Sequence, residues 1–123
     1  MKPELKYIEL KTGYSDNGPA WIGYVEYSKS RKTIYFNDKA FGGNGHGGCN
    51  DVESGETYWI TGIKNDGNNR HQLGKGIIQI EETAIEEYEA ITGIKVRQNK
   101  NYKVVRIKPT DKKRFEILLN EKL

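Results

Sequence analysis

The feature that most constrains this chain is a set of short segments in which apolar and polar side chains alternate. The clearest is AWIGYVEYS, residues 20–28, where Trp21, Val25 and Tyr27 fall on one side of an extended chain. A two-residue period is typical of a β-strand with one buried face and does not suit a helix. A charged turn and the β-branched, aromatic residues 33–37 follow, so the sequence predicts a hairpin.

Four more segments carry strand signatures and lie between turn-forming pairs such as Asn-Gly and Asp-Gly. They are residues 4–12, 56–64, 77–81 and 102–108. The strands are closely spaced, and no alternation of strand and helix occurs early in the chain. This order favours antiparallel pairing over a parallel sheet.

One segment has a different period. Apolar residues recur every three positions in residues 83–92, which predicts one amphipathic helix. Thr83 and Glu86 have the spacing of a capping box, in which the hydroxyl and the carboxylate each accept a hydrogen bond from a backbone amide at the start of the helix. Gly93 is placed to end the helix in the left-handed conformation.

Together these elements predict a single, mainly β domain of the α+β class over residues 1–123. We expect a small, strongly twisted antiparallel sheet or a partly closed barrel of the Src-homology-3-like or OB-like kind, with the helix at one end. Residues 42–55 are expected to form a flexible glycine-rich loop. The tail, residues 110–123, is predicted to be a short docking helix or a further strand, with the helix favoured.

The single cysteine, Cys49, cannot form an internal disulfide, which fits a reducing compartment. The N-terminal MKPELKYIEL lacks the apolar run of a signal peptide, and no stretch approaches the roughly 18 apolar residues of a membrane span. We therefore expect a cytoplasmic protein without a membrane partner.

Glycine fills five of the seven positions from Gly42 to Gly48, and Gly43 and Gly45 begin a match to the dinucleotide pattern G-x-G-x-x-G that Gly48 completes. That pattern holds a pyrophosphate only where the N-terminus of a helix follows it. Here a turn and the strand-like ETYWITGIK follow. We therefore expect no dinucleotide and interpret the segment as a connection between strands.

Three potential metal ligands, His46, Cys49 and Asp51, lie close together in the sequence, and His71 could approach them across the sheet. Their spacing matches no standard zinc pattern, so we expect no metal and no other cofactor. Cys49 would need an oriented histidine to act as a nucleophile, and nothing nearby orients one. The helical glutamates are expected to be solvated, so the sequence predicts no catalytic residues.

Charge is unevenly distributed although the net charge is only +3: residues 95–114 carry nine Lys and Arg against one Asp. Residues 27–36, YSKSRKTIYF, also interleave basic and aromatic side chains. Cations beside exposed rings are typical of proteins that bind single-stranded nucleic acid. The candidate contacts are Lys29, Arg31, Lys32, Tyr35, Arg97, Lys103 and Arg106.

A simpler interpretation of both features stays open, because charges often form a solvated face and rings often form the core. In alternating strands Trp21, Val25 and Tyr27 would share one buried face, and so would Tyr58 and Ile60.

The strings KTGYSDNGPAWIG, TIYFN, YWITGIKNDGNNRH and IEEYEAITG resemble a family of short bacterial proteins of uncharacterised function. The resemblance covers residues 5–93. Members often carry the label 1-deoxy-D-xylulose-5-phosphate synthase. Such a synthase must enclose thiamine diphosphate and magnesium between large α/β domains, which takes several times this chain, so we do not expect that activity here.

The sequence therefore predicts a small, non-enzymatic binding module. Nucleic acid is the leading ligand, and the alternative is a protein partner, as for an adaptor, an antitoxin or an immunity-type protein. The oligomeric state stays open. The deciding observation is whether the cations of residues 29–32 and 95–114 converge on exposed rings.

Overall fold

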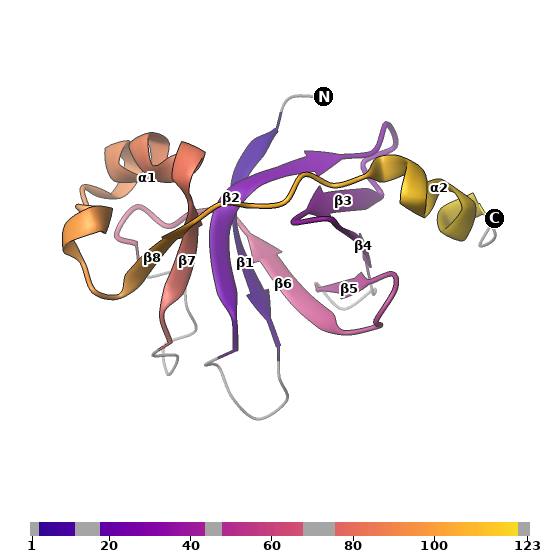
Figure 1. The fold of residues 1–123 in the computed structure, drawn as a ribbon, viewed down its shortest axis with the longest axis horizontal. Helices are drawn as coiled ribbons and strands as arrows, with labels where there is room; N and C mark the ends of the chain where they lie inside the picture. The colour runs from indigo at the N-terminus through magenta and orange to yellow at the C-terminus, as the bar shows by residue number, and fades with distance from the viewer. Residues whose placement is uncertain (1–2, 12–17, 44–47, 68–75, 121–123) are drawn as a thin grey trace.

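The computed structural model describes residues 3–11, 18–43, 48–67 and 76–120 (Figure 1). The strands in this part of the chain are β1 (Glu4–Leu10), β2 (Ala20–Tyr27), β3 (Thr33–Phe36), β4 (Lys39–Gly43), β5 (Cys49–Asp51), β6 (Thr57–Thr61), β7 (Ile78–Glu81) and β8 (Tyr102–Val105). The helices are α1 (Ile85–Thr92) and α2 (Lys112–Asn120), with the short 3₁₀ turns η1 (Glu82–Ala84) and η2 (Val96–Gln98).

The first six strands form a closed antiparallel barrel. They pair in the order β1-β6-β5-β4-β3-β2, and β1 also pairs with β2, which closes the ring. Ile8 illustrates the closure, because it lies opposite Trp21 of β2 on one side and Ile60 of β6 on the other. Closure removes the exposed strand edges that an open sheet of this size would present. The predicted mainly β fold with a small barrel and an amphipathic helix is confirmed.

The barrel interior contains one alternate set of side chains from each strand. Ile8, Val25, Phe36, Phe41 and Tyr58 are buried there, with partly buried side chains packed around them. The set includes the residues that the alternation placed together, namely Trp21 and Tyr27 with Val25, and Ile60 with Tyr58. Most of the aromatic residues of these strands are therefore core residues.

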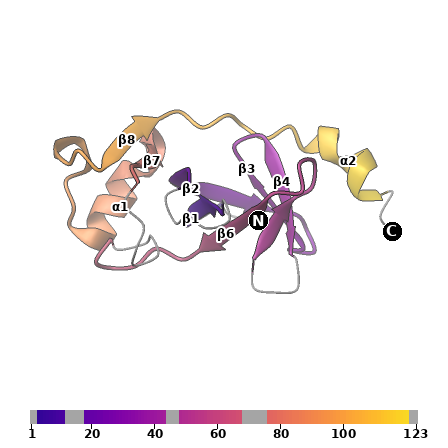
Figure 2. The ribbon, with the colours of Figure 1, turned by 90° about the horizontal axis from the view of Figure 1, so that it is seen from below.

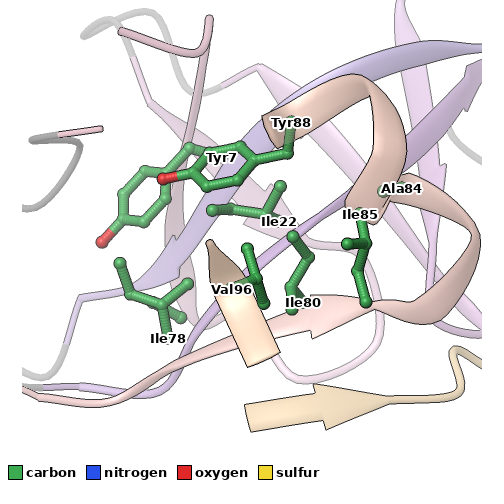
Figure 3. Close-up of a cluster of buried hydrophobic side chains, with 9 residues drawn as sticks. Tyr7, Ile22, Ile78, Ile80, Ala84, Ile85, Tyr88 and Val96 are labelled. Atoms are coloured by element: carbon green, nitrogen blue, oxygen red, sulfur yellow. The ribbon is translucent and has the colours of Figure 1, made fainter. Parts of the chain in front are cut away.

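A second core lies outside the barrel, between α1 and the outer face of β1 and β2. Figure 3 shows Tyr7 and Ile22 from this face gathered with Ile80 of β7 and with Ile85 and Tyr88 from the helix. Because β1 and β2 are covered on both faces, three consecutive residues of β1 are buried, from Tyr7 to Glu9. A strand buried on both faces loses the simple apolar–polar alternation.

Strands β7 and β8 extend the sheet beyond the barrel in a parallel arrangement. Strand β7 pairs in parallel with β2, and β8 pairs in parallel with β7. The chain between β7 and β8 contains η1, α1 and η2, so this part is a strand–helix–strand unit, which parallel neighbours require. The sequence pattern predicted antiparallel pairing only, and this crossover is the exception.

The start of α1 also differs from the prediction. A 3₁₀ turn that contains Thr83 precedes the helix, and the N-cap is Ala84 without a hydrogen bond from a capping side chain. The predicted capping box of Thr83 and Glu86 is therefore wrong. The C-terminus follows the prediction, since Gly93 adopts a left-handed conformation with φ of 74°.

The segment predicted as a glycine-rich loop, residues 42–55, is partly strand. Gly42 and Gly43 end β4, and Cys49–Asp51 forms β5, which pairs with β4 and β6. No helix follows Gly48 before β6. The predicted bounds of the loop are therefore too wide, because residues 42–55 include the end of β4 and all of β5.

The chain after β8 crosses the barrel to reach α2 at the opposite end of the molecule (Figure 1). The β3–β4 turn holds this crossing segment, because the Asn37 side chain accepts a hydrogen bond from the Lys108 amide at 3.2 Å and the Asp38 amide donates one to the Thr110 hydroxyl at 3.0 Å. Phe115 then anchors α2, and it is fully buried against Tyr35 and Ala40 on the outside of the barrel. The expected docking helix is present.

One edge of β2 is shared between two strands. Ala20–Ile22 pairs with β7, whereas Glu26 and Tyr27 pair with β3. Between these regions the Tyr24 amide donates its hydrogen bond to the Glu81 carboxylate at 2.9 Å. The carboxylate can approach only because residue 23 is glycine: a Cβ there would lie 2.8 Å from Glu81 Oε2 and 2.7 Å from the Phe36 ring.

Candidate functional site: an apolar groove beside α1

The predicted nucleic-acid contacts do not form one surface. The turn that carries Lys29, Arg31 and Lys32 lies at the β3 end of the molecule, whereas η2 and β8, which carry Arg97 and Lys103, lie at the opposite end of its long axis (Figures 1 and 2). A single strand could therefore contact both groups only by crossing the whole barrel.

Tyr35, the predicted stacking residue, is buried with 8% of its surface exposed, because it packs against Phe115 of α2. This burial counts against the prediction that Tyr35 contacts a nucleic-acid base. Arg31 forms an ion pair with Glu4 at 3.1 Å and stacks 4.3 Å above the Tyr27 ring, so intramolecular contacts engage it. Arg106 lies 3.6 Å from Glu82 and is 92% exposed. Lys29, Lys32, Arg97 and Lys103 are also exposed.

The glycine-rich segment shows no preformed site in its described part. Cys49 is half-buried at the edge of the barrel core, and burial raises the pKa of its thiol, which opposes thiolate formation. His46, His71 and Gly45 lie outside the described residues. Within the described residues, no three His, Cys, Asp or Glu side chains come together as a metal site.

Asp51, one of the potential ligands, has a structural role instead. Its carboxylate accepts hydrogen bonds from the amides of Glu53 at 2.8 Å and Ser54 at 3.3 Å, and Lys39 lies 3.4 Å away. Burial raises the pKa of this carboxyl group, but the amide hydrogen bonds and Lys39 outweigh burial and leave the pKa below its ordinary value. Asp51 therefore stabilises the turn between β5 and β6.

The structure contains a groove that the sequence did not predict. It is a hollow of about 740 Å³ between the start of β1, the middle of β2, the segment after β6 and the helix α1. We call it the α1 groove. Its lining residues are Pro3, Glu4, Leu5, Tyr24, Ile63, Asn65, Glu87 and Ile91. A hollow of this size is within the range of protein ligand sites.

The floor of the α1 groove is apolar. Leu5, Tyr24 and Ile63 are partly buried, and all three pack on the second core beneath α1. Ile91 stands at the helical side with 37% of its surface exposed, and it is one of three large hydrophobic residues that are exposed in the described part of the chain. An apolar floor that rests on a packed core is a firm surface for an apolar side chain.

The rim of the α1 groove is acidic. Glu87 accepts a hydrogen bond from the Tyr24 hydroxyl at 2.9 Å, and Glu4, which forms an ion pair with Arg31 at 3.1 Å, also lines the groove. Burial and then the Glu87 carboxylate, with further contributions from Glu81 and Glu86, raise the pKa of Tyr24 to about 12. Burial is the largest cause of this shift, and the carboxylates of Glu87, Glu81 and Glu86 add to it.

Two groups in the α1 groove have a displaced pKa, Glu4 and Tyr24, and neither titrates near neutral pH. Hydrogen bonds from Arg31 and Tyr27 hold the pKa of Glu4 below its ordinary value, so it stays ionised, and the raised pKa of Tyr24 keeps that hydroxyl protonated. Efficient general acid–base catalysis needs a group that exchanges protons near the working pH.

Comparison of the chain with models of known protein families, with curated proteins and with solved structures finds no match. The resemblance to the short bacterial proteins therefore stays a prediction. In the described part of the chain, no helix combines the length and the apolar character needed to cross a membrane.

The groove residues come from four separate segments, and only Ile91 carried a visible signal. It belongs to the three-residue apolar period of residues 83–92, from which the sequence predicted an amphipathic helix. Ile91 is the second-last residue of an eight-residue helix, and it is exposed although it continues the apolar stripe.

Proposed function

We propose that this protein is a small binding module without catalytic activity, and that it binds a protein partner in the α1 groove. The observation that carries the proposal is the apolar floor beneath an acidic rim. Exposed apolar surface that is surrounded by polar groups is typical of protein interaction sites. The fitting partner is a short segment that places an aliphatic or aromatic side chain on the floor and a Lys or Arg beside Glu87.

Nucleic-acid binding is less well supported than the sequence suggested. The candidate cations lie at two ends of the molecule, and the candidate ring, Tyr35, packs against Phe115. Single-strand binding requires a cationic path with accessible rings along it. The separation therefore favours the alternative that the sequence left open, a protein partner.

The proposal can be tested by selecting peptides from a random displayed library on the immobilised protein. We expect the selected peptides to share a basic residue next to a large apolar one. Ile91→Lys should weaken their binding about tenfold or more, because it removes apolar contact area and adds a repelling charge. Ala90→Lys is the matched control, since Ala90 is exposed on the same helix but does not line the groove.

A charge-only variant separates the rim from the floor. Glu87→Gln retains an oxygen that can accept the Tyr24 hydrogen bond but removes the negative charge. It should lower the affinity for the peptides by up to about fivefold and reduce the salt dependence of binding. Equal loss with Ala90→Lys and Ile91→Lys would refute the groove, as would selected peptides without basic residues.

A further inference from the structure

Strand β8 has an open edge. The pairing order of the sheet ends at β8, whereas the other terminal strand, β1, returns to pair with β2. In the described part of the chain, β8 pairs on one side only, with β7. It lies at the outer margin of the molecule beside α1 (Figures 1 and 2). An open edge presents unpaired backbone donors and acceptors that can pair with another extended chain.

The surroundings of this edge are strongly basic. Lys103 is exposed in the middle of β8, and Lys100 and Arg106 are exposed on either side of the strand. Residues 95–108 contain six Lys and Arg and no Asp or Glu. Glu82 lies 3.6 Å from Arg106 and offsets part of its charge, so the excess positive charge at this edge comes from Lys95, Lys100 and Lys103. A positive potential therefore surrounds the edge.

A shallow hollow of about 600 Å³ adjoins the start of β8. Ile94, Lys95, Gln98, Asn99, Lys100 and Asn101 line it. Two ammonium groups and three side-chain amides thus surround it without a carboxylate. These groups can donate hydrogen bonds to a carboxylate in line with the edge.

From these observations we propose that β8 binds an extended acidic segment of a partner protein by strand addition. The backbone of the segment pairs with the open edge, and its Asp or Glu side chains contact Lys103 and the hollow at Lys95 and Lys100. A second copy of this chain fits poorly, because β8 pairing with β8 would bring the two Lys103 side chains and their basic flanks together.

A nucleic acid would satisfy the cations but would leave the edge unpaired. Its stacking would also need an accessible ring, and the ring on β8, Tyr102, packs on the second core with its hydroxyl 2.7 Å from that of Tyr88. The edge and the charge together therefore fit an acidic peptide better.

The test uses the full chain, labelled with ¹⁵N, and a capped peptide of about eight alternating Glu and Val residues, a typical strand length or slightly longer. Two matched peptides carry N-methyl groups on alternate amides, one in each frame. We expect the parent peptide to shift the amide signals of residues 102–105 and to slow the hydrogen exchange of the Val104 amide, because alternate amides of β8 face the open edge and the Tyr102 amide already donates to the Asn99 carbonyl. N-methylation in the frame that faces β8 should weaken binding about tenfold or more, and the other frame should not.

Protein variants provide the second arm. The double change Lys100→Glu and Lys103→Glu should lower the affinity for the parent peptide about tenfold, because it replaces two cations with repelling carboxylates. Both positions are exposed, so we expect the fold to tolerate the change. Ile91→Lys should leave this affinity unchanged, so failure of the edge and failure of the α1 groove are distinguishable.

Three results would overturn the proposal. The first is equal binding of the parent and both N-methylated peptides, which would indicate charge attraction alone. The second is absence of any signal change at residues 102–105 at millimolar peptide. The third is salt-sensitive binding of a single-stranded oligonucleotide at these residues when the peptide does not bind, which would assign the surface to nucleic acid.

Discussion

Gly23 is the position where the packing of this barrel makes the sharpest demand on the sequence. A Cβ at this position would lie 2.7 Å from Cε1 of Phe36 and 2.8 Å from Oε2 of Glu81, whereas ordinary contacts begin at 3.4 Å. Phe36 is 3% exposed in the barrel core, so its ring cannot move into free space. The Glu81 carboxylate could withdraw, but it would then lose its hydrogen bond with the Tyr24 amide.

We therefore expect Gly23→Ala to destabilise the protein by about 1–5 kcal/mol. Overpacking of a core costs about 1–3 kcal/mol, and weakening a hydrogen bond to a charged group adds about 1–2 kcal/mol. The reduced entropy of the unfolded chain offsets about 0.4–1 kcal/mol of this cost. For a chain of this size, a loss of about 2 kcal/mol corresponds to a fall in Tm of about 8 °C.

Urea unfolding monitored by tryptophan fluorescence would measure the change, with Gly42→Ala as the matched control. Gly42 also lies in a strand of the barrel, but a Cβ there would meet nothing within 4 Å. The control should change stability by no more than about 1 kcal/mol. If both variants unfolded at the same urea concentration as the parent, the packing derived for β2, Phe36 and Glu81 would be wrong.

Three further changes test other parts of the structure. Phe115→Ala should destabilise the docking of α2 by about 3–5 kcal/mol and raise hydrogen exchange in residues 112–116 before the barrel unfolds; unchanged exchange there would contradict docking through this ring. Asp51→Asn should lower the stability by about 1 kcal/mol at pH 7 and make it depend less on pH in acid. The pKa of Asp51 is lowered in the folded state, so its contribution is complete above the ordinary value of 3.8 and is lost as the pH falls through the lower folded value. Equal acid midpoints for parent and variant would disprove this role. Burial, with Glu56 and Asp51 nearby, raises the pKa of Tyr58 to about 12, so stability should fall as the pH rises from the ordinary value of 10 towards 12. Tyr58→Phe should remove this part of the alkaline loss of stability. An ultraviolet titration that placed the Tyr58 ionisation near 10 would count against the buried site.

Much of the barrel could be predicted because its strands alternate regularly. Residues 20–28 and 56–64 each place one set of side chains together, and the structure confirms this in the contacts of Trp21, Val25 and Tyr58. Local periodicity indicates which side chains share a face, but it did not show that the second core covers the other face of β2.

Strands β4 and β5 could not be predicted in the same way. Strand β4 ends in two glycines, and β5 has three residues with no β-branched or aromatic side chain. These segments are extended because their neighbours in the closed ring pair with them, for example Phe41 with Asp51. This is a tertiary effect, and local β-propensity does not predict it.

The α1 groove was hidden for a related reason. Its floor combines Leu5, Tyr24, Ile63 and Ile91, which the barrel closure and the placement of α1 bring together. The predicted cationic site shows the opposite case, in which residues close in the sequence lie apart in the fold. Proximity in the sequence suggested that Tyr35 would stand beside Arg31 and Lys32, but Tyr35 points to the outer face of the barrel that α2 covers.

A map of amide signal changes in the ¹⁵N-labelled protein, recorded with a peptide selected as described above, tests the central claim most directly. We predict that the shifted signals belong to residues 4–5, 24, 63–65 and 87–91, and that Ile91→Lys abolishes the shifts. Signals that move only at residues 29–32 and 95–106, with an oligonucleotide producing the same pattern, would contradict a protein-binding groove beside α1.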